Sequence, residues 1–161
     1  MKNKLLFLTL IFCQLSFSQN IPPEISSDGS QIYCPLSFQS IVTGFNIIDP
    51  DDSSIDALYI QISEGYVEGE DFLTLAGEHP GVQETWNAIE GKLELTGNGG
   101  VQVLYVDLIA AVYDIKFNSV NPNPSDKSFS FTIGDTNYLD STGHYYEFIS
   151  LVDVTWTESE A

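Results

Sequence analysis

The chain has 161 residues, of which 23 are acidic and five are basic, giving a formal net charge of −18 at pH 7. All five basic residues are lysines. This balance argues against binding to nucleic acid or to anionic membrane surfaces, where Lys and Arg must neutralise phosphate. It is compatible with cation binding, and its simplest effect is to keep neighbouring molecules apart in solution.

The first 18 residues have the pattern of a secretory signal peptide. Two lysines within residues 1–4 precede the apolar run 5–12, and small residues follow around Ser18. The run is too short to cross a bilayer, so we expect cleavage and a mature chain that is secreted or displayed on the cell surface without inserting into the membrane. A lipoprotein signal at Cys13 is the weaker alternative, because Phe12 fits poorly before it.

Cleavage would leave Cys34 as the only cysteine, so no internal disulfide can form. A domain of this size buries about two-thirds of its unfolded surface and can be held by its core alone. Because Cys34 precedes Pro35 in a predicted loop, a free structural thiol is a simpler interpretation than a nucleophile.

Residues 19–36 are rich in Pro and Ser and predict an extended lead-in with one edge strand. Residues 41–48 are apolar at both alternating sets of positions, which predicts a strand in the centre of a sheet, followed by a turn at residues 49–54. Alternation or flanking glycines predict further strands over residues 58–63, 72–75, 84–87 and 91–97.

A different spacing begins after Gly99 and Gly100, where apolar residues fall on one face of a helix. They are Val101, Leu104, Tyr105, Leu108 and Val112. This spacing predicts a short helix over residues 101–110, which would cap one end of the sandwich described below.

Two runs with period-two alternation follow, at residues 112–118 and 128–133, separated by a Pro- and Asn-rich loop. Each run has one apolar and one polar face, and we expect them to form an antiparallel pair whose apolar face the rest of the chain covers. Together with the other short strands, they predict an all-β, two-sheet Greek-key sandwich with one short helix, and a closed barrel is the alternative.

The tail differs from the rest of the chain. Residues 140–143 predict a turn and residues 144–149 a strand. Thr155 and Glu158 have the spacing of a capping box, which predicts the start of a helix. We therefore expect a sandwich over residues 37–136 and the truncated start of a second module over residues 137–161.

Several segments together resemble bacterial cadherin-like repeats, which are Ig-like sandwiches of large secreted adhesins. They are residues 47–51, 65–73, 86–95, 113–117 and 129–135. The resemblance covers about residues 37–136. The leader and lead-in resemble those of exported Bacteroidetes proteins of the gliding-motility and type IX secretion group. Residues 144–148 and 155–161 look like the opening of a C-type lectin-like domain, which implies that the chain is part of a longer multidomain adhesin.

Two acidic clusters and one strand-end carboxylate are candidate metal ligands. They are Asp49, Asp51 and Asp52, then Glu68, Glu70 and Asp71, and finally Asp135. Calcium takes six to eight oxygen ligands, which neighbouring turn carboxylates can supply. The resemblance implies calcium at strand ends and repeat junctions. The simpler interpretation is that these are solvated turn residues, for which Asp is favoured.

The sequence favours a non-catalytic extracellular adhesion module that binds Ca²⁺ and has surface glycans or other adhesin modules as partners. No nucleophile motif or phosphate-binding loop is present, His79 and His144 are isolated in the sequence, and an enzyme is therefore the least favoured class. The alternative is a carbohydrate-binding module that uses aromatic side chains such as Tyr66, Trp86 and Tyr105.

Overall fold

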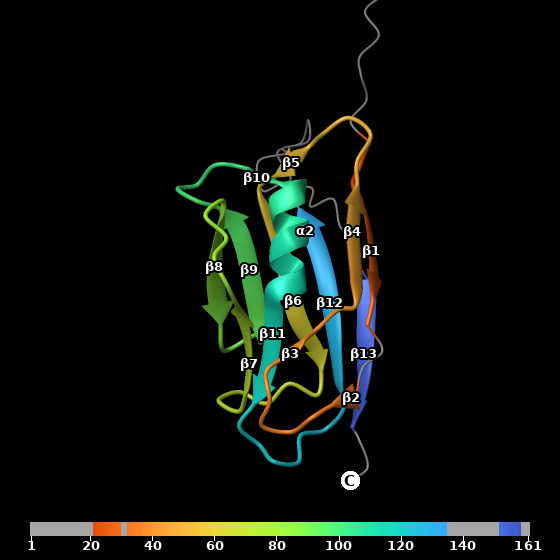
Figure 1. Ribbon diagram of the computed structural model, residues 1–161, viewed down its shortest axis with the longest axis vertical. Helices are drawn as coiled ribbons and strands as arrows, with labels where there is room; N and C mark the ends of the chain where they lie inside the picture. The colour runs from red at the N-terminus through yellow and green to blue at the C-terminus, as the bar shows by residue number, and fades with distance from the viewer. Residues whose placement is uncertain (1–20, 30–31, 135–151, 159–161) are drawn as a thin grey trace, which may run out of the picture.

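The computed structural model describes residues 21–29, 32–134 and 152–158, the last as backbone only, and within these ranges it is a two-layered β-sandwich with one helix (Figure 1). The prediction of an all-β sandwich with one short helix is therefore confirmed. The predicted signal peptide, His144, Asp135 and the predicted strand at 144–149 lie outside the described residues.

One layer is a six-stranded sheet in the order β2-β13-β12-β6-β9-β8. Its strands are β2 (Ile32–Tyr33), β13 (Val152–Glu158), β12 (Lys127–Gly134), β6 (Ala57–Glu64), β9 (Lys92–Gly97) and β8 (Val82–Asn87). Neighbouring strands are antiparallel except β2 and β13, which are parallel.

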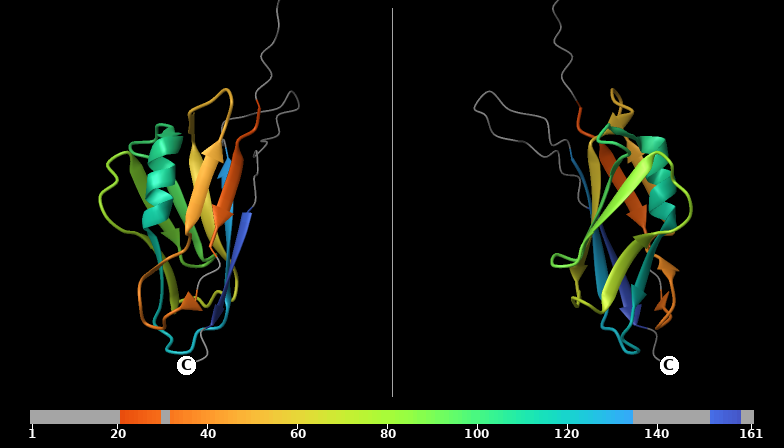
Figure 2. Two further views of the ribbon diagram at one scale, coloured as in Figure 1. Left: turned by 45° about the vertical axis from the view of Figure 1, so that its right-hand side comes forward. Right: turned by 90° about the vertical axis from the view of Figure 1, so that its left-hand side faces the viewer.

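The opposite layer is composite, as the three views show (Figures 1 and 2). It contains a two-stranded ribbon, a helix and a three-stranded sheet in the order β3-β11-β7. These elements are β1 (Glu24–Asp28) with β4 (Gly44–Ile48), α2 (Tyr105–Asp114), and β3 (Gln39–Ser40), β11 (Ile115–Ser119) and β7 (Asp71–Leu75). A short pair, β5 (Ser54–Ile55) with β10 (Val103–Leu104), closes the upper end in Figure 1.

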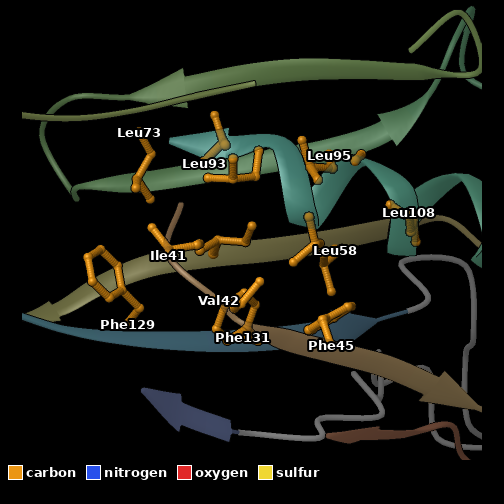
Figure 3. Close-up of a cluster of buried hydrophobic side chains, with 14 of the residues drawn as sticks. Ile41, Val42, Phe45, Leu58, Leu73, Leu93, Leu95, Leu108, Phe129 and Phe131 are labelled. Carbon is orange, nitrogen blue, oxygen red and sulfur yellow. The ribbon is translucent and has the colours of Figure 1, made fainter. Parts of the chain in front are cut away.

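The core lies between the two layers and consists of apolar side chains that point inward from both of them (Figure 3). The six-stranded sheet contributes Leu58, Leu93, Leu95, Phe129 and Phe131, and the opposite layer contributes Ile41, Val42, Phe45, Leu73 and Leu108. Because burial of one such side chain stabilises a fold by about 1.5–3 kcal/mol, this cluster is the main source of stability.

The prediction that the runs 112–118 and 128–133 pair with each other is wrong. β11 pairs with β3 and β7, whereas β12 pairs with β6 and β13, so the two strands belong to opposite layers. Their apolar faces point toward each other across the core. The loop between them, from the end of β11 at Ser119 to the start of β12 at Lys127, crosses from one layer to the other. A two-residue hairpin turn would instead keep both strands in the same sheet.

The helix begins four residues later than predicted and ends at Asp114. Val103 and Leu104 pair with β5 instead, and this leaves Val101 65% and Leu104 48% exposed. Tyr105, Leu108 and Val112 face the core as the spacing predicts. The helix does not cap one end of the sandwich, because it lies beside β4 over the face of the six-stranded sheet (Figure 1).

The strand expected in the centre of a sheet is an edge strand. Among the described residues β4 pairs only with β1, which is the edge strand predicted in the lead-in. On its other side, the Tyr113 hydroxyl accepts a hydrogen bond from the Phe45 N–H (3.1 Å) and donates one to the Phe45 carbonyl (3.3 Å). Although both faces of β4 carry apolar residues, only one face is buried. Phe45 lies in the core, whereas Ile48 is exposed.

The capping box at Thr155–Glu158 does not start a helix. These residues belong to β13, which pairs along β12 and β2. Pairing with β12 supplies the backbone hydrogen bonds that a helix would otherwise make, and tertiary pairing overrides the local signal. The expected boundary at residue 136 therefore does not separate this strand from the sandwich, to which the lead-in also contributes β1 and β2.

Candidate cation site

The first predicted acidic cluster is brought together in the turn that joins β4 to β5. The Asp49 side chain folds back over the turn, and its Oδ1 accepts hydrogen bonds from the backbone N–H groups of Asp51 (3.1 Å) and Asp52 (3.0 Å). Such side-chain-to-backbone bonds favour Asp at turns. One ligand oxygen from each of the three carboxylates lies within 4.8 Å of the others.

Two further groups bind these carboxylates. The Tyr105 hydroxyl, at the start of α2, donates a hydrogen bond of 2.7 Å to Asp49 Oδ2. The backbone N–H of Ile21 lies 3.1 Å from Asp51 Oδ2 and 3.4 Å from Oδ1. The turn is thus held from both sides, by the helix and by the segment that enters β1.

An open pocket of about 400 Å³ adjoins the cluster. It is lined by Ile47, Ile48, Asp49, Asp52, Ser53, Leu104, Tyr105 and Val106. Most of this lining is apolar, with the carboxylates at one side, and Asp51 and Asp52 are exposed. The pocket is large enough for a hydrated cation or for a small apolar side chain.

Burial and hydrogen bonding change the acidity of two groups here. Partial burial opposes ionisation of Asp49, but the bonds from Tyr105 and from the Asp52 and Asp51 N–H groups outweigh it and lower its pKa below 3.8. For Tyr105, burial and then the bond to Asp49 raise the pKa far above its usual value. The tyrosine hydroxyl therefore stays protonated and acts as a donor, while Asp49 stays ionised at neutral pH.

The arrangement offers three negative charges at one turn. Asp49 already accepts three hydrogen bonds, and each of its oxygens retains only part of its capacity for a cation. Asp51 and Asp52 are exposed and supply the oxygens that are freer to turn toward an ion. A Ca²⁺ ion here would keep several water ligands, since it takes six to eight oxygens.

The second predicted cluster is not brought together. Glu68 is exposed at the turn, and Glu70 accepts a hydrogen bond from Asn121 Nδ2 (2.8 Å). Asp71 is buried and forms an ion pair with Lys127 instead. Within the described residues only Asp49, Asp51 and Asp52 form a group with metal-ligand spacing. The seventh candidate, Asp135, lies outside them.

His79, which is isolated in the sequence, has a partner in the fold. Its Nε2 lies 3.1 Å from Asp114 Oδ2 at the end of α2, and its side chain is mostly buried. This contact connects the loop between β7 and β8 to the end of the helix. Packing is therefore a sufficient explanation for this histidine.

The aromatic residues considered for sugar binding are divided between the two ends of the sandwich. Tyr66 and Trp86 pack edge to face, with ring centroids 6.3 Å apart, and both contact the core. Tyr105 is buried beside Asp49. In Figure 1 the β6–β7 connection lies at the lower end and the start of α2 at the upper end. The three rings therefore do not form one platform.

Sequence reasoning missed two contacts at these clusters, namely Tyr105 with Asp49 and Lys127 with Asp71. Each pair is 56 residues apart in the chain, so local patterns carry no information on the pairing. One signal was available for Lys127, because it is in phase with the apolar stripe Phe129, Phe131 and Ile133. A lysine in an inward-facing position requires a buried partner.

No protein-family model matches this chain, and no curated protein or solved structure matches it at a significant level. Within the described residues, no helix has the length and apolar character needed to cross a membrane.

Proposed function

We propose that this chain is a non-catalytic β-sandwich module of a secreted or surface-displayed adhesin, and that the turn carrying Asp49, Asp51 and Asp52 binds Ca²⁺. The observation that supports the calcium site best is the convergence of three carboxylate oxygens within 4.8 Å at one end of the sandwich. The overall negative charge also favours cations near this surface.

A cation at this turn would stabilise the contacts that the turn makes with its neighbours. The turn contacts the segment entering β1 through Ile21 and the start of α2 through Tyr105. A bound ion would offset the mutual repulsion of the three carboxylates and stiffen the end of the module where the chain enters the sandwich. Surface glycans or other adhesin modules are the proposed partners of such a stiffened domain.

Thermal unfolding with and without calcium tests the site. At a tenfold excess over Kd, an ion that binds only the folded state adds about 1.4 kcal/mol of stability, which corresponds to a rise of a few degrees in Tm. We expect this rise in millimolar CaCl₂ and its reversal by EDTA. An unchanged Tm across the calcium series would remove the calcium site from the proposal.

Matched variants separate binding at this turn from a general charge effect. Asp51→Asn with Asp52→Asn should abolish the calcium-dependent rise in Tm. Glu68→Gln with Glu78→Gln removes the same charge at exposed positions elsewhere and should preserve the rise. Loss of the rise in both double variants would show a nonspecific effect of net charge.

A carbohydrate-binding module is the second candidate. It is favoured only by the Tyr66–Trp86 pair, whose rings are partly exposed at the surface. Sugars stack on an open aromatic face, whereas these rings cover each other edge to face, and this weakens the case. A glycan array that yields ligands whose binding is lost in Trp86→Ala, with unchanged binding in Asp51→Asn, would favour this candidate over the first.

A further inference from the structure

Lys127 and Asp71 meet inside the core, between the two layers. Asp71 is the first residue of β7 and Lys127 the first residue of β12, so they come from opposite layers. Lys127 Nζ lies 2.7 Å from Asp71 Oδ2, and the two side chains are only 3% and 1% exposed. Water that would screen and solvate an exposed ion pair is thus excluded from this one.

The hydrogen bonds around this pair are incomplete at Asp71. Asp71 Oδ2 also accepts a bond of 2.8 Å from the Val67 N–H, and Lys127 Nζ also donates one to the Gly65 carbonyl. Asp71 Oδ1, in contrast, is buried and has no hydrogen-bond partner among the described residues. A buried carboxylate oxygen without a donor is costly, because its solvation by water is lost without replacement.

We propose that Lys127 and Asp71 condense to form an intramolecular amide, a covalent link between β12 and β7. The reaction needs a nucleophilic amine, a carboxyl carbon and no external reagent. Two groups held in contact by a rigid core have a very high effective concentration, which removes most of the entropic barrier to the bond. Exclusion of water from the site also protects the product from hydrolysis.

The step balances without an oxidant or a co-reactant. Transfer of one proton from the Lys127 ammonium to the Asp71 carboxylate gives a neutral amine and a carboxylic acid, which removes two buried charges. The amine lone pair then forms the Nζ–Cγ bond, and the Cγ–Oδ1 bond breaks. Oδ1 leaves as one water molecule that carries two protons, one from the carboxylic acid and one from the attacking nitrogen.

The surroundings fit the amide better than they fit the ion pair. The atom that leaves is Oδ1, the Asp71 oxygen that has no partner among the described residues. The oxygen that remains, Oδ2, keeps the Val67 N–H as its donor, and the single N–H left on Nζ keeps the Gly65 carbonyl as its acceptor. Every polar atom of the product is therefore satisfied by groups already in place, and no buried charge remains.

Peptide mapping of the full chain tests the link. The chain has only five basic residues, all lysines, so complete tryptic digestion of the denatured protein gives few cuts. We expect cleavage after Lys92 and Lys116 but not after Lys127, and one joined fragment that contains both position 71 and position 127. Its mass should be lower than that of its parts by one water molecule.

The variant Asp71→Asn gives a sharper check, because condensation of the introduced side-chain amide with Lys127 releases ammonia and yields the same product. Its joined fragment should have the same mass as the wild-type one, although the unreacted chains differ in mass. Lys127→Arg cannot form the amide and should give separate fragments. If purified wild-type protein, after prolonged incubation in its folded state, is cut after Lys127 as completely as after Lys116, the proposal is overturned whatever the variants show.

Discussion

The rings of Phe117 and Phe129 meet nearly perpendicular, with centroids 5.6 Å apart, although one belongs to β11 and the other to β12. The two strands are close in sequence and lie in different layers. Their contact therefore joins the layers through the middle of the core, and the loop between them forms an arch and not a hairpin.

Phe117→Ala tests how much this contact contributes to the stability of the fold. Both rings are fully buried, and truncation of a buried Phe costs about 3–5 kcal/mol through lost burial and the remaining cavity. We expect a loss of that size in the free energy of unfolding measured with urea. Phe38→Ala is the control, since Phe38 is 70% exposed and its truncation should change the stability by less than about 0.5 kcal/mol. Equal losses in both variants would contradict the described core.

Most strand positions were predictable here, and strand partners were not. The alternation at Phe117 and Phe129 is local, and it is the same for a hairpin and for an arch, because both bury one face of each strand. Only the connection distinguishes them, and a loop of this length leaves both open. The acidic turn at Asp49 was predictable because its members are neighbours in sequence. The buried pair of Asp71 and Lys127 was not, because no local pattern joins residues so far apart.

Tyr113→Phe tests the hydroxyl that borders β4. The change removes the group that bonds both the N–H and the carbonyl of Phe45, and we expect a loss of about 1 kcal/mol. Amide hydrogen exchange should show the effect locally. Exchange at Phe45 should be faster in the variant than in the wild type, and the increase should be larger there than at the other buried amides of the sandwich. Val106→Ala, on the exposed face of the same helix, should leave the exchange at Phe45 unchanged.

Acid unfolding should report the Asp49 turn. Because the folded-state pKa of Asp49 is lowered below 3.8, the unfolded chain binds its proton first as the pH falls, and stability is lost below about pH 4. Asp49→Asn removes the titrating group and should flatten this part of the stability profile. Tyr105→Phe keeps the carboxylate but removes a donor and should flatten it in part. A profile unchanged in both variants would contradict the assignment.

Two glycines in one acidic loop should respond differently to alanine. Gly65 has φ +72°, and a Cβ there would lie 2.1 Å from the Asp126 carbonyl oxygen, whereas Gly69 has φ +80° and open space around it. Gly69→Ala should cost about 1–2 kcal/mol from the left-handed backbone alone. Gly65→Ala should cost a further 1–3 kcal/mol, roughly, because a backbone atom must move. Urea titration of both variants measures the difference directly.

The Tyr113 hydroxyl of α2, which bonds the backbone of β4, has a counterpart beside β7. There the Leu75 N–H donates a hydrogen bond of 2.7 Å to the Glu84 side chain. An open strand margin is a template on which another chain can add and so start an aggregate. At these two margins side chains of the same molecule already occupy backbone groups that an incoming strand would need. Crowded copies of the protein should therefore resist edge-to-edge polymerisation there, and the acidic surface would add to that resistance by repelling each approaching molecule.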